Sequence, residues 1–184
     1  MLADQDILKE IAAGNIVCQP FVEANLSNSS LDLRLGGTVK KLVQNPGALI
    51  SFQADGNGKV EVNYDNCDFE SLDIKQTGYI LAPQEFILAE TLEHVGQPCN
   101  FIISEVADKS SLARVGIGVC FSAGYIDAGN VLNITLEIVN HSSVPIRLIW
   151  GQHICQLKFQ YLNSPCVNPY NGKYLNSRTV QAGK

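Results

Sequence analysis

The sequence predicts a single, mainly β domain, barrel-like or sandwich-like. Three observations support this: apolar residues follow a period of two over most of the chain, β-branched and aromatic residues gather in short runs, and turn residues punctuate those runs. The chain has 184 residues, of which 46% are hydrophobic and 17% charged. That composition is enough to bury a substantial core, so we expect one domain over residues 1–184.

The first expected element is a short amphipathic helix over residues 4–13. Asp4 is a candidate N-cap, and apolar residues recur at helical spacing as far as Ile11. Gly14 stands where a residue in the left-handed conformation ends many helices.

Short strands are expected after this helix. Between them lie clusters of Gly, Pro, Asn and Asp that favour turns, such as Gly36-Gly37 and Ala82-Pro83. The expected strands cover residues 31–35, 79–81, 86–89, 100–106, 134–139, 144–150 and 153–161.

Two stretches do not fit this pattern. Residues 44–77 are polar and read as an excursion from the core, with a hairpin turn at Asp55–Gly58. Residues 163–184 contain two prolines and show little apolar periodicity. We therefore expect a mobile C-terminal tail, which could close over a ligand.

Charge and composition exclude several classes of protein. The net charge of −5 argues against a nonspecific nucleic-acid surface. The N-terminus has no export signal and no run of about 18 apolar residues occurs, so we expect no membrane segment and a cytoplasmic location. The six cysteines lack CxxC spacing and the three histidines lie far apart, so we expect reduced thiols and no zinc site.

The densest group of chemically useful side chains follows an expected strand. Lys109 and Arg114 supply two cations, and Ser110 and Ser111 supply two hydroxyls, within one short segment. Hydroxyls, main-chain N–H groups and a forked guanidinium together can bind a phosphate chain. The alternative is a capped helical turn with solvated charges.

A second candidate is a carboxylate in the middle of an expected strand. If Ile134 and Ile138 face the core, then Glu137 faces the other way, between β-branched residues. A carboxylate in such a cleft is suited to moving protons. The alternative is an ordinary cross-strand ion pair.

Several segments together resemble the dCTP deaminase family in order and spacing. They are "LADQDI", "SSLDLRLGG", "DKSSLARVGI", "AGYIDAG", "ITLEIVN", "GQHICQL" and "PYNGKY". The resemblance spans nearly the whole chain except the middle excursion. It implies the distorted β-barrel shared with the related trimeric dUTPases, and a homotrimer with active sites between subunits.

The resemblance implies zinc-independent hydrolytic deamination of dCTP to dUTP and ammonia, which supplies dUTP or dUMP for thymidylate synthesis. Glu137 matches the glutamate that activates water for attack on cytosine C4 and carries the proton to the departing ammonia. Ser110 and Arg114 match the residues that position the water and polarise the cytosine. The H-x-E and P-C-x-x-C elements of the zinc deaminases are absent from the sequence.

The resemblance implies that four further residues bind the phosphates or close over the nucleotide. Lys109 and Ser111 are similar to residues of the triphosphate-binding loop. Tyr170 and Lys173 are similar to tail residues that close over the nucleotide. We expect Mg²⁺ to arrive with the triphosphate and to keep its waters, with no dedicated protein site.

The resemblance implies that three more residues recognise the sugar and the base. Asp127 matches the aspartate near the deoxyribose, whose counterpart in dUTPases is associated with the hydrolytic water. The main-chain groups of Thr135 and Leu136 match those that recognise the edge of the base.

Three residues depart from the family pattern. Asn130 stands where an aromatic residue is usual, Leu132 where glycine is usual, and Ser177 where glutamine is common. These departures indicate altered packing against the sugar, altered turn geometry, or tolerance for a modified cytosine.

Three alternative functions remain open from the sequence. A bifunctional deaminase that releases dUMP and pyrophosphate is favoured by "AGYIDAG". A dUTPase-like pyrophosphatase is supported by Asp127 and opposed by Glu137 and by the missing glycine-rich C-terminal motif. A non-catalytic nucleotide-binding module is suggested by the departures and opposed by the presence of Glu137, Ser110 and Arg114.

Overall fold

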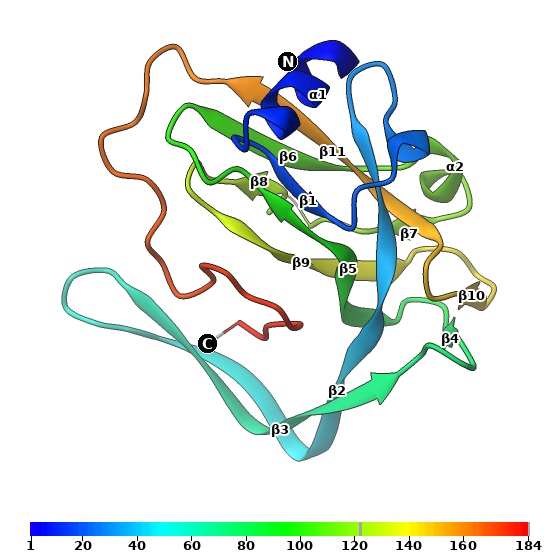
Figure 1. The fold of residues 1–184 in the computed structure, drawn as a ribbon. Coiled ribbons are helices and arrows are strands. Elements are labelled where there is room, and N and C mark those ends of the chain that lie inside the picture. The colour runs from blue at the N-terminus through cyan, green and yellow to red at the C-terminus, as the bar shows by residue number, and fades with distance from the viewer. Residues whose placement is uncertain (122, 184) are drawn as a thin grey trace.

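The computed structural model describes residues 1–121 and 123–183. It is built from antiparallel strands, with one N-terminal helix and one helical turn (Figure 1). In this part of the chain, neither helix has the length and apolar character needed to cross a membrane. The mainly β fold expected from the sequence is confirmed.

The seven expected strands are present in order, although several differ in length, and the described chain has four further strands that were not expected, β1, β3, β7 and β8. The strands expected at 79–81 and 153–161 have those bounds, whereas the one expected at 31–35 continues to residue 54 because β3 pairs along it. The elements are α1 Asp4–Ala12, β1 Val17–Gln19, the 3-10 turn Glu23–Asn25, β2 Leu31–Ala54, β3 Val60–Asp73, β4 Tyr79–Leu81, β5 Phe86–Gly96, β6 Ile102–Asp108, α2 Ser110–Ala113, β7 Ile117–Gly118, β8 Tyr125–Ile126, β9 Val131–Asn140, β10 Ile146–Leu148 and β11 His153–Tyr161.

The main sheet runs in the order β7-β9-β5-β2-β11-β6-β8, with β1 added beside β5 and β3 beside β2. Strands β4 and β10 form a separate small pair. Register shifts interrupt the pairing of β2 with β5, of β5 with β9 and of β11 with β2. Such irregularities bend strands, and the sheet curls around its core as a distorted, open barrel.

The N-cap of helix α1 lies one residue before the expected cap, Asp4. Ala3 is the N-cap and makes no side-chain cap hydrogen bond. Asp4 is the first helical residue, and its carboxylate accepts a hydrogen bond from the main-chain N–H of Gln5 at 2.7 Å. The expected Asp4 cap is therefore wrong. The expected end of the helix is confirmed, because Gly14 has a φ of +76° and donates to the carbonyl of Ile11.

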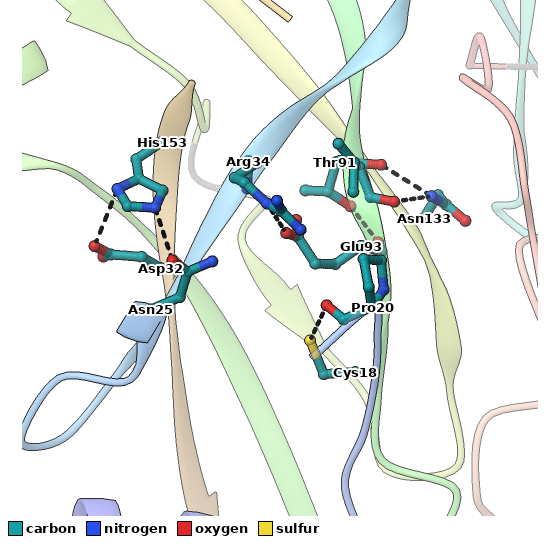
Figure 2. Close-up of polar contacts among 10 residues, drawn as sticks. Cys18, Pro20, Asn25, Asp32, Arg34, Thr91, Glu93, Asn133 and His153 are labelled. Carbon is teal, nitrogen blue, oxygen red and sulfur yellow. Dashed lines mark hydrogen bonds and ion pairs between the residues drawn. The ribbon is translucent and has the colours of Figure 1, made fainter. Parts of the chain in front are cut away.

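The core consists of the inward-facing residues of the curled sheet. On β9, Ile134, Leu136 and Ile138 are buried, as the period of two predicts. An ion pair joins β2 to β5: Arg34 Nε is 2.6 Å from Glu93 Oε1, and Glu93 is 1% exposed (Figure 2). A charge this deep requires a partner, because an unpaired buried charge is strongly destabilising.

The outer parts of β2 and β3 form a two-stranded ribbon that projects from the barrel, here called the arm (residues 42–69; Figure 1). Its tip is the expected hairpin turn, in which Asp55 Oδ1 accepts hydrogen bonds from the N–H groups of Asn57 and Lys59. Gly58 has a φ of +80° there. The expected excursion from the core and its hairpin are confirmed.

The C-terminal tail is docked against the barrel in this structure. It runs back between the arm and β9 (Figure 1). Its main chain bonds to the body of the protein from Tyr170 N to Ala128 O, and from Asn133 N to Ser177 O, at 2.8 Å each. Val180 is 1% exposed. The mobility of the tail stays a prediction.

Candidate active site

A cavity of about 590 Å³ lies where β9, the arm and the C-terminal tail meet. Most of its lining is apolar, and the arm contributes Ile50, Tyr64 and Phe69. The polar lining comes mainly from β9, the turn before it and the tail. A mostly apolar, concave site with a few convergent polar groups is typical of small-molecule binding.

Glu137 places a carboxylate at this cavity. Its Oε2 accepts a hydrogen bond from the main-chain N–H of Phe121 at 3.3 Å. Phe121 is held there by edge contact with Phe86, with ring centroids 6.1 Å apart. The residue opposite Glu137 on β5 is the apolar Leu88, and Glu137 makes no ion pair in the described part of the chain. The cross-strand ion pair considered for Glu137 is therefore not found.

The cavity gathers four of the site residues expected from the sequence: Asp127, Thr135, Glu137 and Tyr170. Leu136 lies behind this wall with its side chain 1% exposed in the core, which agrees with a role through its main chain. Bringing together residues from 127 to 170 requires the tail to fold back onto β9.

The cavity also gathers all three departures from the family pattern: Asn130, Leu132 and Ser177. The main-chain bond between Asn133 N and Ser177 O holds the tail against the start of β9. The three positions therefore share one wall of the cavity, although 47 residues separate the first from the last.

The phosphate-binding candidates lie elsewhere in the protomer. In the described chain, none of Lys109, Ser110, Ser111 and Arg114 lines the cavity. They form α2 and its flanks, where the N–H of Arg114 donates to the carbonyl of Ser110 and both serines are exposed. The helical turn considered as an alternative is present, but its N-cap makes no side-chain cap hydrogen bond.

Lys109 is engaged in an ion pair that the sequence did not reveal. Its Nζ lies 2.5 Å from Asp32 Oδ2, and both side chains are mostly buried. Asp32 also accepts a hydrogen bond from Gln156. Its Oδ2 lies 3.7 Å from His153 Nδ1, and Figure 2 shows the His153 ring beside the Asp32 carboxylate. Asp32 belongs to "SSLDLRLGG", but 77 residues separate it from Lys109, so no local signal pairs them.

Lys173 also lies outside the cavity lining. Its Nζ is 4.9 Å from the centroid of the Tyr174 ring, a cation–π distance. Tyr174 itself lines the cavity, so the Lys173 charge lies near the rim.

A half-buried carboxylate holds the end of the tail. Glu90 Oε2 accepts a hydrogen bond from the N–H of Val180, and Thr135 Oγ1 accepts one from the N–H of Gln181, both at 3.1 Å. Glu90 is the cross-strand partner of Thr135. Burial raises the pKa of the Glu90 carboxyl above its ordinary value, although hydrogen bonds from Thr38 and Val180 act in the opposite direction.

Sequence reasoning missed the arm as part of the site. The alternation that brings Val62 and Tyr64 to one face is visible in the sequence, whereas Phe69 reaches Tyr64 only past the irregular pairing near Asn66, which has a φ of +51°. What this face covers depends on the path of β2 out of the barrel, which short-range patterns do not encode. Tyr174 and Gln181 were missed for the same reason.

Comparisons with known proteins give consistent results. A family model described as "dCTP deaminase-like" matches residues 1–162. Two similar proteins are named "dCTP deaminase, dUMP-forming". The one from Methanosphaera stadtmanae is 36% identical and covers 100% of this chain and 93% of its own. The one from Dictyoglomus thermophilum is 33% identical, with coverage of 100% and 94%.

A solved structure supports the fold. The 2'-deoxycytidine 5'-triphosphate deaminase from Agrobacterium tumefaciens superposes with a TM-score of 0.62 at 22% sequence identity. The match covers 86% of this chain and 47% of that one. The curled sheet is therefore the fold of this structural group.

Proposed function

The chain belongs to the dCTP deaminase-like family, and on that premise we propose that it hydrolyses dCTP to dUMP, ammonia and pyrophosphate. The sequence alone favoured dUTP as the product, with dUMP as the alternative. The names of the relatives, which cover the whole chain, support the alternative. A cytoplasmic location is part of this proposal.

The observation that carries the proposal is the Glu137 carboxylate, which lies at a mostly apolar cavity, accepts a hydrogen bond from the N–H of Phe121 and has no ion-pair partner among the described residues. A carboxylate with free lone pairs in such a site can hold a water molecule and take its proton. The resulting hydroxide adds to cytosine C4, and the same carboxyl returns the proton to the exocyclic nitrogen. The C–N bond then breaks, so that one water is consumed and one ammonia is released.

The base is proposed to be positioned beside Glu137 by the main chain of the same strand, β9. The main-chain groups of Thr135 and Leu136 are proposed to bond to the edge of the cytosine, because they lie two residues and one residue before Glu137 on β9. The Leu136 side chain is locked in the core, which fixes the position of that main chain. Fixed donors need no reorganisation when charge develops in the transition state.

The second hydrolysis is assigned to Asp127. Its exposed side chain lines the cavity at the turn before β9. We propose that it orients a water for attack on the α-phosphorus of the dUTP formed in the first step. The bond to the β-phosphate breaks, and dUMP and pyrophosphate leave.

The triphosphate requires local cations in a chain whose net charge is −5. Lys109, Ser111 and Lys173 are the proposed partners of its oxygens, with Tyr170 closing over the nucleotide. In the described part of the chain, no group of three or more His, Cys, Asp or Glu could hold a metal ion. We therefore propose that Mg²⁺ arrives with the triphosphate and is held by phosphate oxygens and water.

We propose a homotrimer whose active sites lie between subunits. This is supported by the distribution of the residues within one protomer. Ser110 and Arg114, the proposed positioning groups for water and cytosine, are not in the cavity lining that contains Glu137. A neighbouring subunit that presents its α2 turn to this cavity would complete the set.

The test is incubation of the purified protein with dCTP and Mg²⁺, with dUTP as a parallel substrate. Ammonia is measured, and dUTP, dUMP and pyrophosphate are resolved by chromatography. Ammonia together with dUMP is the expected result, whereas ammonia with dUTP alone would make it a monofunctional deaminase. Hydrolysis of dUTP with dCTP untouched would identify a dUTPase-like pyrophosphatase, and binding without turnover a non-catalytic module.

A further inference from the structure

One buried polar atom of the cavity wall has no partner. Asn130 is 6% exposed and lines the cavity. Its side-chain oxygen Oδ1 is buried and has no hydrogen-bond partner in the described structure. Nearly all buried polar side-chain atoms in proteins are hydrogen-bonded, so each exception requires an explanation.

The main chain of Asn130 is fixed in place, so its short side chain stays anchored at the cavity wall. Its N–H donates to the carbonyl of Asp127 at 3.2 Å, and its own carbonyl accepts from the N–H of Gln97 at 2.9 Å. Gly96 packs so tightly here that a Cβ on it would lie 2.1 Å from the Asn130 carbonyl oxygen. The carboxamide therefore stays at the wall, where an apolar side chain of the same size would avoid the cost of a buried unpaired acceptor.

The missing partner is a hydrogen-bond donor, because Oδ1 can only accept. The phosphates of a nucleotide are acceptors. The exocyclic amine of cytosine is placed by the proposed function at Glu137, near the end of β9, whereas Asn130 precedes the first residue of that strand. The donors that remain are the hydroxyls of the sugar. Asp127, the residue assigned to the deoxyribose end, is bonded to Asn130 through the main chain.

We propose that Asn130 is a specificity-determining residue whose carboxamide oxygen accepts a hydrogen bond from a hydroxyl on the sugar of the bound nucleotide. This inference rests on the proposed function for the orientation of the nucleotide. The hydroxyl comes from one of two sources: the 3′ position, which a deoxyribonucleotide carries, or the 2′ position, which only a ribonucleotide carries.

The test compares nucleotides that differ by one hydroxyl. Dissociation constants for dCTP, its 2′,3′-dideoxy analogue and CTP are measured in a Glu137→Gln background, so that no nucleotide is consumed, with and without Asn130→Leu. If the donor is the 3′-hydroxyl, its removal weakens binding about tenfold with Asn130 and leaves it within about twofold with leucine. If the donor is the 2′-hydroxyl, CTP binds about tenfold more tightly than dCTP only when Asn130 is present.

A matched control uses the same wall. Leu132→Ala changes its shape without changing any hydrogen-bonding side chain, so it should shift all three dissociation constants by the same factor. The melting temperature of ligand-free Asn130→Leu should equal or exceed that of its parent, because the variant removes an unpaired buried acceptor. A clearly lower melting temperature would show that the carboxamide supports the fold, and would overturn the proposal.

The remaining outcomes separate this proposal from the function on which it rests. The protein could bind the nucleotides with affinities that depend on a sugar hydroxyl to the same extent with and without Asn130→Leu. That result would overturn the role of Asn130 alone. If the unaltered protein bound none of the three nucleotides, both the role of Asn130 and the proposed function would be wrong.

Discussion

The cavity wall on β9 and the α2 turn carry the two parts of the proposed chemistry, and they are built in different ways. The wall is anchored in the core: the neighbours of Glu137 on its strand, Leu136 and Ile138, are almost fully buried. The α2 turn is one exposed helical turn, and its main cation is held by Asp32. In the proposed function, proton transfer therefore falls to a strand fixed by the core. Phosphate binding falls to an exposed turn that a neighbouring subunit could present.

The largest expected loss of activity comes from changing Glu137 in the cavity wall. Glu137→Gln keeps the shape of the side chain and removes the base, so deamination should fall by about 10³-fold or more. Nucleotide affinity should stay within a few-fold, measured by titration calorimetry. Glu105→Gln, on the exposed side of β6, is the matched control and should keep full activity. Substantial deamination by Glu137→Gln would disprove the role of Glu137.

The next effect tests whether the two parts come from different subunits. Arg114→Ala alone should reduce activity by about 100-fold, because it removes a group that stabilises developing charge. When it is mixed with Glu137→Gln and the subunits are exchanged, about a quarter of the sites in a random trimer regain both residues from two chains. Activity after denaturation and refolding of the mixture measures this. A mixture that stays inactive would place both residues in the same protomer.

The tail gives an intermediate effect. Removal of the chain after Ser164 should weaken triphosphate binding by about tenfold, because closing segments contribute contacts that sequester the substrate, while the barrel stays folded. Val180→Asp should reproduce most of this loss, because Val180 is 1% exposed. Val167→Asp is the matched control at a position that is 91% exposed. The Michaelis constant reports on substrate binding, and circular dichroism reports on whether the barrel is folded. An unchanged Michaelis constant in the truncated chain would rule out the closing role.

A smaller effect is expected at the α2 turn. Asp32→Asn removes the charge that competes with phosphate for Lys109, so a triphosphate should bind about two- to fivefold more tightly. The affinity for the nucleoside, which has no phosphates, should not change. Asp73→Asn removes an exposed partner of Lys75 and should leave both affinities unchanged. Weaker triphosphate binding by Asp32→Asn would show that Asp32 orients Lys109 for phosphate instead of competing for it.

The smallest effect concerns the pH dependence of stability beneath the tail. Because burial raises the pKa of the Glu90 carboxyl, the folded chain holds this proton more tightly than the unfolded chain. The contribution of Glu90 to the free energy of unfolding is therefore full below the ordinary carboxyl pKa and is lost as pH rises through the raised value. Glu90→Gln should remove this part of the slope in urea unfolding, whereas Glu61→Gln on the exposed arm should not. An identical slope in both variants would contradict the prediction.

Much of the fold and part of the site could be predicted locally. Alternation on β9 gave the correct inward face, and glycine at position 14 gave the correct helix end. The N-cap predicted at Asp4 was wrong because Asp4 is already helical and the N-cap is Ala3, whose side chain cannot cap. The lengths of β2 and β3 were missed because their pairing holds polar residues in extended conformation.

The sequence by itself determined the mainly β class, the order of seven strands along the chain, the carboxylate on β9 and the family resemblance. These depend on periodicity, turn chemistry and spacing within short segments. Only the tertiary structure decided that Asn130, Leu132 and Ser177 share one wall, that Lys109 pairs with Asp32, and that the arm covers the cavity. These contacts join residues far apart in the chain. Their formation depends on how the curled sheet and its register shifts bring those segments together, which no local pattern records.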